Sequence, residues 1–384
     1  MKVVVAIDSF KGCLSSMDAA DAAEKGIRRV YPRAKIIKLA IADGGEGTVE
    51  ALASQRGAKL VYAGVKNPLG RKIRAAYALL NAKSAVLEVA KASGLPLLKK
   101  SELNPLKTST LGTGELIKNA LRRGVKIFTI GIGGSATNDG GMGMLAALGV
   151  KFFDVNANKI KNFGGANLIR VARIDCAGML PELKHAKFTV LCDVDNPFCG
   201  KTGAAHIYAP QKGASPEMVK QLDVGLYSFA AVMENTTGRD IRKIPGAGAA
   251  GGLGGAFLAF MNAKLERGID GVLDAVKFEQ KLSGTDFVIT GEGRLDAQSA
   301  MGKAPSGIAE RAAKMNIPVI AIAGGIKTGA EKLYETNIAA MFSVCRAPVS
   351  LEEAMNPKNA AGNLERLCEN IFRLIQMIKK HAGN

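Results

Sequence analysis

Short runs rich in β-branched and apolar residues alternate with helix-like stretches along almost the whole chain of 384 residues. The opening run KVVVAID (2–8) is followed by an amphipathic stretch at 15–31. A second strand-like run at 34–42 and a helix-like stretch at 47–57 repeat this order. Such alternation is typical of α/β folds, and it predicts largely parallel sheets.

The alternation of strand-like and helix-like segments is interrupted in the middle of the chain and resumes near its end. Two strand-like runs between about residues 60 and 90 flank a Pro-Leu-Gly turn, which predicts a hairpin. DFVITGEG (286–293) and IPVIAIAGG (317–325) then resume the opening pattern. We therefore expect the two chain ends to build one domain. The predicted bounds are 1–63 with 286–384 for a discontinuous Rossmann-like α/β domain, and 64–285 for an inserted α/β domain that carries the glycine-rich loop.

Composition narrows the class of protein. With 47% hydrophobic and 22% charged residues, the chain has the composition of a soluble globular protein. No apolar run reaches the length of about 20 residues that a membrane-spanning helix needs, and the N-terminus lacks the features of a secretory signal. The six cysteines form no CxxC pair, so neither a disulfide framework nor a zinc site is indicated. These features predict a cytoplasmic protein.

The formal charge of +18 raises the question of a nucleic-acid partner. Lys and Arg are spread along the whole chain, and only 5% of residues are aromatic, with no Trp. A positive potential also steers small polyanions into a site, and we favour such ligands over nucleic acid. With three histidines in the chain, a zinc enzyme or a Ser-His-Asp hydrolase is not indicated.

The most distinctive motif is GIGGSATNDGGMG (131–143), which follows the apolar run VKIFTI. Gly131, Gly133 and Ala136 fit the G-x-G-x-x-G/A dinucleotide pattern, and Asp154 stands near the position of a ribose-binding acid. That pattern would place glycine, Asn and Asp in the first helical turns, where each is unfavourable. We instead predict a helix from about 140–142, preceded by a wide loop that Asn138 or Asp139 caps.

A loop of this kind suits anions. Its backbone N–H groups, the hydroxyls of Ser135 and Thr137, and the following helix N-terminus together form an anion cradle. A second phosphate motif is absent, because CGKTGA (199–204) has Asp195 where a Walker A sequence needs its first glycine.

Four further segments place polar residues directly after a predicted strand. In α/β sheets this is the edge at which ligands bind. On a strand, Asp193 and Asp195 point to the same face, so both carboxylates could meet one Mg²⁺. Carboxylates for Mg²⁺, cations for phosphate charge and an acid near a hydroxyl are what phosphoryl transfer requires. The segments are DSFKG (8–12), ADGGEGT (42–48), CDVDNPF (192–198) and TGEGRLDAQSAMGK (290–303).

Seven motifs in order give the chain a family resemblance from residue 2 to about 325. It closely resembles the bacterial class I glycerate kinases, with two small departures: Cys13 where the family often has Ser, and a more basic FCGKTGAA (198–205). The motifs are DSFKG, ADGGEGT, GIGGSATNDGG, CDVDNP, APQKGA, GAGAAGGLGG and VITGEGRLDAQ.

The resemblance implies ATP-dependent phosphorylation of D-glycerate with Mg²⁺, most often to 2-phosphoglycerate, at a cleft between two α/β domains. A kinase of another small hydroxy acid is the main alternative, and an NAD-dependent dehydrogenase is the next. Neither a nucleic acid nor a membrane is expected as a partner, and the oligomeric state stays open.

On this hypothesis the polar residues divide into four groups. Asp193 is the leading base for the substrate hydroxyl and Asp8 the second, while Lys11 and Arg294 offset negative charge. Ser9, Asp43, Gly44, Gly45 and Lys212 bind substrate. Gly133, Gly134, Ser135, Thr137, Asn138 and Asp139 bind the nucleotide, and Asp195, Glu292 and Asp43 hold Mg²⁺.

Overall fold

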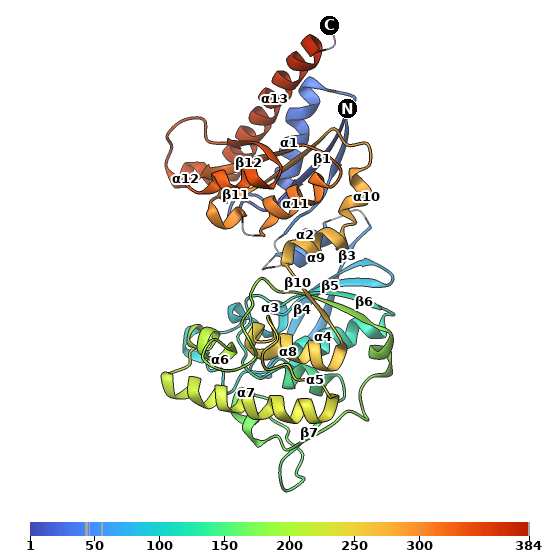
Figure 1. Ribbon diagram of the computed structural model, residues 1–384, viewed down its shortest axis with the longest axis vertical. Helices are drawn as coiled ribbons and strands as arrows, with labels where there is room; N and C mark the ends of the chain where they lie inside the picture. Colours follow the sequence, from blue (N-terminus) through green and yellow to red (C-terminus); the bar gives the residue numbers. More distant parts are fainter. Residues whose placement is uncertain (43–44, 46, 55–56, 301, 383–384) are drawn as a thin grey trace. The chain divides into compact units, whose positions relative to one another are not determined.

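A computed structural model describes residues 1–42, 45, 47–54, 57–300 and 302–382 (Figure 1). The chain forms two compact units, one made of Met1–Asp43 with Val272–Asn384 and the other of Gly44–Gly271. Both are mixed α/β structures with largely parallel sheets, so the predicted α/β class is confirmed. In the described part of the chain, the longer helices are too polar or too short to cross a lipid bilayer.

The first unit is built on a five-stranded parallel sheet with the strand order β13-β12-β11-β1-β2. Alternate residues Val3, Val5 and Ile7 of β1 are fully buried in one core cluster with side chains of α1 and α13. Ser15 caps α1, because its hydroxyl accepts a hydrogen bond from Asp18 N. The strands are β1 (Lys2–Ile7), β2 (Lys35–Lys38), β11 (Phe287–Leu295), β12 (Val319–Ile326) and β13 (Ile338–Ser343), and the helices are α1 (Ser16–Val30), α10 (Phe278–Leu282), α11 (Ala304–Ala313), α12 (Leu351–Ala354) and α13 (Pro357–Ala382).

The second unit is built on a six-stranded sheet with the order β10-β9-β6-β5-β4-β3. Its first four strands are parallel, and β5, β4 and β3 form an antiparallel meander that contains the predicted hairpin. A separate antiparallel pair, β7 (Lys151–Phe153) and β8 (Arg173–Asp175), lies outside this sheet. The strands of the main sheet are β3 (Lys59–Lys66), β4 (Lys72–Asn81), β5 (Ser84–Glu88), β6 (Ile127–Gly131), β9 (Lys187–Leu191) and β10 (Lys264–Glu266).

Helices of the second unit are α2 (Thr48–Ala53), α3 (Ala90–Ser93), α4 (Leu111–Arg122), α5 (Met142–Ala147), α6 (Ala204–Tyr208), α7 (Pro216–Thr237) and α8 (Ala249–Met261), and α9 (Gly268–Ala275) follows β10. The predicted start of α5 near Met142 is confirmed. Helix α8 ends at Met261, although the apolar run FLAFMNAKL (257–265) continues beyond it. Asn262 takes a left-handed conformation that ends α8, and residues 264–266 pair with β9 as strand β10.

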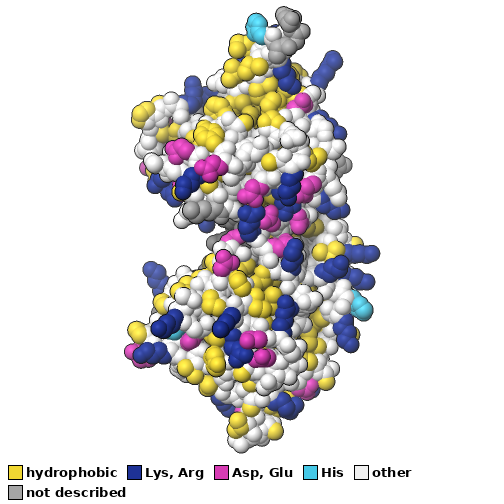
Figure 2. Space-filling model, viewed as in Figure 1, with side chains coloured by type: hydrophobic (Ala, Val, Ile, Leu, Met, Phe, Trp, Pro, Cys, Tyr) yellow, Lys and Arg dark blue, Asp and Glu magenta, His cyan; other side chains and the backbone are white. Residues whose placement is uncertain are grey.

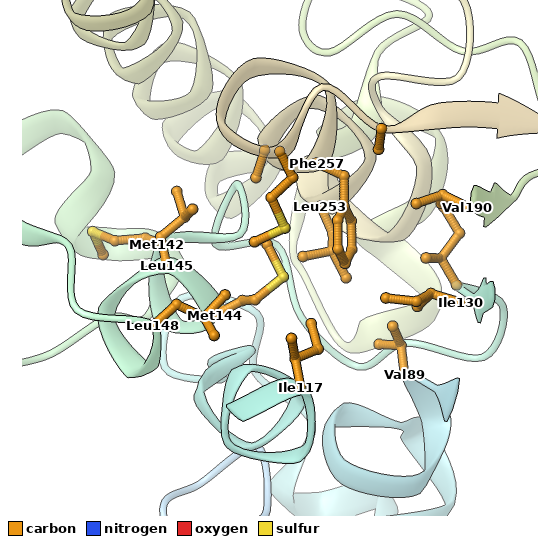
Figure 3. Packing of buried hydrophobic residues seen from close by; sticks show 14 of the residues in the cluster. Val89, Ile117, Ile130, Met142, Met144, Leu145, Leu148, Val190, Leu253 and Phe257 are labelled. Carbon is orange, nitrogen blue, oxygen red and sulfur yellow. The ribbon is translucent and has the colours of Figure 1, made fainter. Parts of the chain in front are cut away.

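The core of the second unit joins the sheet to α5 and α8. Met144 and Leu145 on α5 belong to the same buried cluster as Leu253 and Phe257 on α8 and Ile130 on β6 (Figure 3). The helix that follows the glycine-rich loop is thus anchored in the main core. A rigid core of this kind fixes where the loop begins and ends.

The first unit depends on the close packing of α1 against α13. A Cβ atom on Gly26 would overlap the carbonyl oxygen of Glu365 and lie 2.9 Å from Cys368 Cβ. Arg29 forms ion pairs with Glu365 and Glu369, and the rings of Tyr31 and Phe372 meet edge to face. The glycine is therefore required for the close approach of the two helices.

We expect Gly26→Ala to lower the free energy of unfolding by about 1–3 kcal/mol, because the added methyl group forces α13 away from α1. Gly362→Ala on α13 is the matched control. Only Arg366 Nη2, at 3.9 Å, lies near its Cβ position, so this change should raise stability by about 1 kcal/mol. Urea unfolding of both variants measures the difference, and equal effects would contradict the packing argument.

Candidate active site

The glycine-rich loop runs from the end of β6 to the start of α5. Its first part pairs with the segment after α3: Leu95 N donates to Gly134 O at 2.9 Å, and Ala136 N donates to Ser93 O at 2.8 Å. Gly133 and Gly134 are exposed, whereas the chain from Ser135 to Leu145 is buried. The loop thus presents bare backbone at one end and passes into the interior at the other.

The glycines of the buried end are required by packing. Gly140 has a positive φ of 57°, and a Cβ there would lie 2.9 Å from the ring of Phe229. A second glycine-rich segment lies against the loop, because Gly140 N donates to Gly251 O at 3.0 Å and a Cβ on Gly251 would overlap Thr137 O. Backbone meets backbone at this contact, and side chains have no room.

The second segment has an unusual conformation. Ala250, Gly251 and Gly252 all have positive φ angles, of 54°, 71° and 89°, just before the regular part of α8. Left-handed geometry strains a residue that carries a Cβ, so Ala250 is held by its surroundings. In the sequence GAGAAGGLGG is recognisable only as a family motif, and the structure places it against the loop.

Asp139 fixes the turn from the loop into α5. Its carboxylate accepts hydrogen bonds from Thr110 N at 2.7 Å, Thr110 Oγ1 at 2.8 Å, and Gly141 N and Gly143 N at 3.2 Å each. The side chain is fully buried. Burial raises the pKa of Asp139, and the four hydrogen bonds oppose that rise. The predicted cap is thus present, and both carboxylate oxygens are used within the protein.

Two neighbouring polar side chains are buried without partners. Asn138 is fully buried, and in the described part of the chain neither its amide oxygen nor its amide nitrogen has a hydrogen-bond partner. The buried hydroxyl of Thr137 likewise has no hydrogen-bond partner among the described residues. Buried polar atoms left unpaired cost about 1–3 kcal/mol each. Bound water or a ligand would supply the missing partners.

Lys212 contacts the same stretch of loop from a short 3₁₀ turn, Pro210–Lys212. Its side chain is 2% exposed, and Nζ donates to Ser135 Oγ at 2.9 Å and to Thr137 O at 2.6 Å. Burial lowers the pKa of Lys212 to about 7, and the charge of Asp139 opposes this shift. Predicted as a substrate-binding residue, Lys212 therefore lies against residues predicted to bind the nucleotide.

The first unit gathers polar residues at the carboxyl edge of its sheet. Asp8 follows β1, and its N–H donates to Gly291 O at 2.9 Å, so Asp8 lies beside Glu292 of β11. Asp8 Oδ1 accepts from Ser9 N at 2.6 Å, and Glu292 accepts from the hydroxyl of Ser299. A carboxylate that follows β1 thus lies beside one within the neighbouring parallel strand β11.

Cations follow at the same edge of this unit. Lys11 is exposed in the turn after β1, and a Cβ on Gly293 would lie 3.5 Å from its backbone nitrogen. Arg294 is exposed on β11 and pairs with Asp296 at 3.4 Å. The carboxyl edge therefore presents both signs of charge.

The predicted geometry of Asp193 and Asp195 is wrong. Strand β9 ends at Leu191, so the two residues lie in irregular chain and do not share a strand face. Both are exposed, and Asp193 Oδ1 accepts from Gly268 N at 2.7 Å, at the start of α9. Gly246, with φ 80°, lies against this segment, and a Cβ there would lie 3.3 Å from Val194 O.

No group of three or more His, Cys, Asp or Glu residues in the described chain is arranged to hold a metal ion. Asp43 and Gly44, predicted for metal and substrate binding, lie outside the described residues. Gly45 is described, and its carbonyl accepts from Thr48 Oγ1 at 2.8 Å in the first turn of α2.

Glu88 was missed by the sequence analysis. It ends β5 beside Gly131, is 2% exposed, and accepts a hydrogen bond from Val49 N of α2 at 2.7 Å. The lone acid at the end of the apolar run SAVLE is a signal that could have identified it. Thr110 was also missed, and a sequence offers no sign of a partner 29 residues away.

Charged side chains do not form one basic surface on the face that Figure 2 shows. Lys and Arg are scattered there and interspersed with Asp and Glu. A buried unpaired amide, an enclosed lysine and carboxylates at the edge of a sheet are features of an enzyme that binds small anionic molecules.

Comparison with known proteins places this chain in the glycerate kinase family. Residues 3–376 match the model of the "Glycerate kinase family". A glycerate kinase of Haemophilus influenzae is 46% identical over 98% of this chain and 99% of its own length. The glycerate 2-kinase of Escherichia coli is 44% identical over the full length of both chains. The chain belongs to the glycerate kinase family, and it is a kinase.

A solved structure agrees with this assignment. A crystal structure described as that of a glycerate kinase 2 from Salmonella typhimurium LT2 matches with a TM-score of 0.91 and 43% identity, over 99% of each chain. The resemblance found in the seven motifs is thereby confirmed, and the dehydrogenase alternative is wrong.

We expect Asp139→Asn to destabilise the protein by about 2–4 kcal/mol, because an amide nitrogen would face backbone N–H donors in a buried site. Asp154→Asn is the control. Asp154 also accepts two backbone N–H groups, from Asn156 at 3.0 Å and Asn158 at 2.9 Å, but in an exposed turn. Thermal unfolding measures both variants, and an equal, small loss in each would contradict the role of Asp139.

We expect the stability of the ligand-free protein to contain a term from Lys212 that rises with pH above about 7. The unfolded chain keeps this lysine protonated to about pH 10.4, whereas the folded state releases the proton earlier. The unfolded state therefore binds more protons in this window, and stability rises by up to about 1.4 kcal/mol per pH unit. Urea unfolding from pH 6 to 9.5 should show a steeper rise for the wild type than for Lys212→Met. If the stability of the two proteins changed with pH in parallel, the titration of Lys212 would make no such contribution.

Proposed function

We propose that this protein phosphorylates D-glycerate with Mg²⁺–ATP, most often at the 2-hydroxyl, by direct in-line transfer of the γ-phosphoryl group. The unpaired buried amide of Asn138, next to the Lys212 amine and the exposed backbone of Gly133 and Gly134, carries the proposal. These are the groups that a phosphate tail can satisfy. The protein would act in the cytoplasm.

In the second unit, the loop would bind the nucleotide. Gly133 and Gly134 offer N–H groups, and Ser135, Thr137 and Asn138 offer side-chain donors. Asp139 would act by holding this loop in place, because its own oxygens are already used. Asp193 is exposed beside the end of the sheet and is proposed as the base that accepts the proton of the glycerate hydroxyl.

In the first unit, Asp8 is the second candidate for that base. Ser9 would bind substrate, and Lys11 and Arg294 would offset the negative charge of the substrate carboxylate and the transferring phosphoryl group. Mg²⁺ usually takes only one or two protein carboxylates together with phosphate oxygens and water. Glu292, which lies beside Asp8, fits that requirement.

Two more acidic residues complete the proposed metal ligands, Asp195 in the second unit and Asp43. Gly44 and Gly45 are proposed to bind substrate with Asp43. When bound, Mg²⁺ would neutralise charge on the phosphate oxygens. The residues of the chain would orient the hydroxyl and accept its proton.

We expect ADP release with D-glycerate, and much weaker release with L-glycerate, glycerol or lactate, because each lacks one of the groups or the configuration that the site holds. Activity should vanish with EDTA and return with Mg²⁺. A coupled ADP assay gives the substrate preference, and ³¹P and ¹³C NMR of the product gives the position of the phosphate. ADP release with another hydroxy acid in preference to D-glycerate would overturn the assignment.

Asp193→Asn tests the base. We expect kcat to fall by about 10²–10⁴-fold, with little change in the KM for ATP, because the amide cannot accept the proton. The amide oxygen can still accept the hydrogen bond from Gly268 N, so the start of α9 should survive. Asp175→Asn is the matched control, since Asp175 is the last residue of β8 and also accepts a backbone N–H, from Ala177 at 2.9 Å. A near-normal kcat in Asp193→Asn would transfer the role to Asp8.

A further inference from the structure

Lys212 is a buried amine that pairs with no counter-ion among the described residues. Its Nζ has two hydrogen-bond partners, the Ser135 hydroxyl and the Thr137 carbonyl, and both are neutral. An ammonium group carries three donors, so one remains for a further acceptor. In the part of the chain that the structure describes, no carboxylate lies within ion-pair distance of Nζ. A lysine enclosed in this way is stable when an anion joins it.

The surrounding groups provide no such anion. Asp139 is the charged group that raises the pKa of Lys212, and the oxygens of Asp139 already accept four hydrogen bonds. Neighbouring elements carry other titratable side chains, and on α7 these include Lys220, which is exposed, and Asp223, which lies 3.7 Å from His206. His206, Glu217 and Lys107 are exposed, and burial raises the pKa of Tyr208, which stays neutral. His206 and Tyr208 lie on α6, Glu217 begins α7, and Lys107 belongs to the segment after Leu103, against which Gly213 packs.

A second, independent observation points to a ligand at the same place. Asn138 is fully buried with both amide atoms unpaired, and Thr137 Oγ1 is unpaired as well. Thr137 is one of the two residues that Lys212 contacts, and the other, Ser135, follows the exposed Gly134. The loop from Gly134 to Asn138 therefore carries exposed backbone and unpaired polar side chains. The amine of Lys212, which has one N–H donor left, contacts Ser135 and Thr137 within this loop.

We propose that Lys212 is the residue that meets the nucleotide phosphate at this loop, and that it takes up a proton from solvent when the phosphate binds. The proposal rests on the proposed function and moves Lys212 from glycerate to ATP. An incoming polyanion replaces the missing counter-ion, so the ammonium form becomes the stable one in the complex. ATP binding and proton uptake are then one event.

Proton uptake can be measured directly by titration calorimetry with Mg²⁺–ATP, without glycerate, in buffers of different ionisation enthalpy. At pH 8 the free amine is mostly neutral, so the wild type should take up about 0.9 proton per ATP more than Lys212→Arg, which is always charged. At pH 6 the difference should fall to about 0.1 proton. Subtracting the proton uptake of Lys212→Arg from that of the wild type removes the contribution of protons that bind to ATP itself.

The affinity for ATP supplies a second readout. Above pH 7 the wild-type affinity should fall by up to about tenfold per pH unit, whereas that of Lys212→Arg should not. If arginine does not fit the enclosed position, Lys212→Met serves instead, with weaker binding and no proton uptake at any pH. Lys220→Met, an exposed lysine on α7, is the control and should behave as the wild type. Thermal unfolding checks that each variant is folded.

The two possible failures differ. ATP binding with equal proton uptake in the wild type, Lys212→Arg and Lys212→Met at pH 8 would overturn the role of Lys212 and leave the kinase proposal intact. Absence of Mg²⁺–ATP binding in the folded wild type would overturn the proposed function itself.

Discussion

The second unit depends on one close approach of two backbones. The chain at Thr137–Gly140 lies directly against the left-handed turn at Ala250–Gly252, with a hydrogen bond of 3.0 Å between Gly140 N and Gly251 O. A methyl group on Gly251 would overlap Thr137 O, and one on Gly252 would lie 3.0 Å from Gly140 Cα. Because α5 and α8 extend from these two segments into one core, the contact also fixes how the helices pack. The glycines therefore serve packing at one end of the loop and leave bare backbone at the other.

Hydrogen bonds from polar side chains further fix the conformation of the glycine-rich loop. Asp139 satisfies the N–H groups at the start of α5 and joins them to Thr110, so the loop cannot change shape without losing four hydrogen bonds. Lys212 holds the preceding residues in the same way. A site for a highly charged ligand must be organised before the ligand arrives, because reorganisation would consume binding energy. The buried polar residues of this loop provide that organisation.

Much of the fold could be predicted from local pattern. The alternation of buried strands with capped helices gave the α/β class, and the cost of glycine in a helix placed the start of α5 correctly. The irregular chain at Asp193 could not be foreseen, because the segment after β9 lies against Gly246, which is 52 positions beyond Val194. Hydrophobic periodicity carries no information on such distant contacts.

The candidate site, too, could be predicted from the sequence only in part. Motifs identified the segments that carry polar residues, since glycine and acid clusters after strands are visible in a sequence. They did not show which side chains are already satisfied within the protein, as Asp139 is, or which are buried without partners, as Asn138 is. That distinction depends on atoms brought together from several elements. It changes Asp139 from a ligand-binding candidate to a residue that supports its neighbours.

The strand order of the first unit has a consequence for synthesis on the ribosome. Strand β1, translated first, lies between β2 and β11, and its Val3 pairs with Phe287. The sheet cannot close until more than 280 further residues have been made, whereas all strands of the other sheet lie between residues 59 and 266. Contacts this distant in the chain form slowly. Until then, β1 can pair with β2, but its other edge has no partner strand, and it is at this stage that chaperones would be of most use.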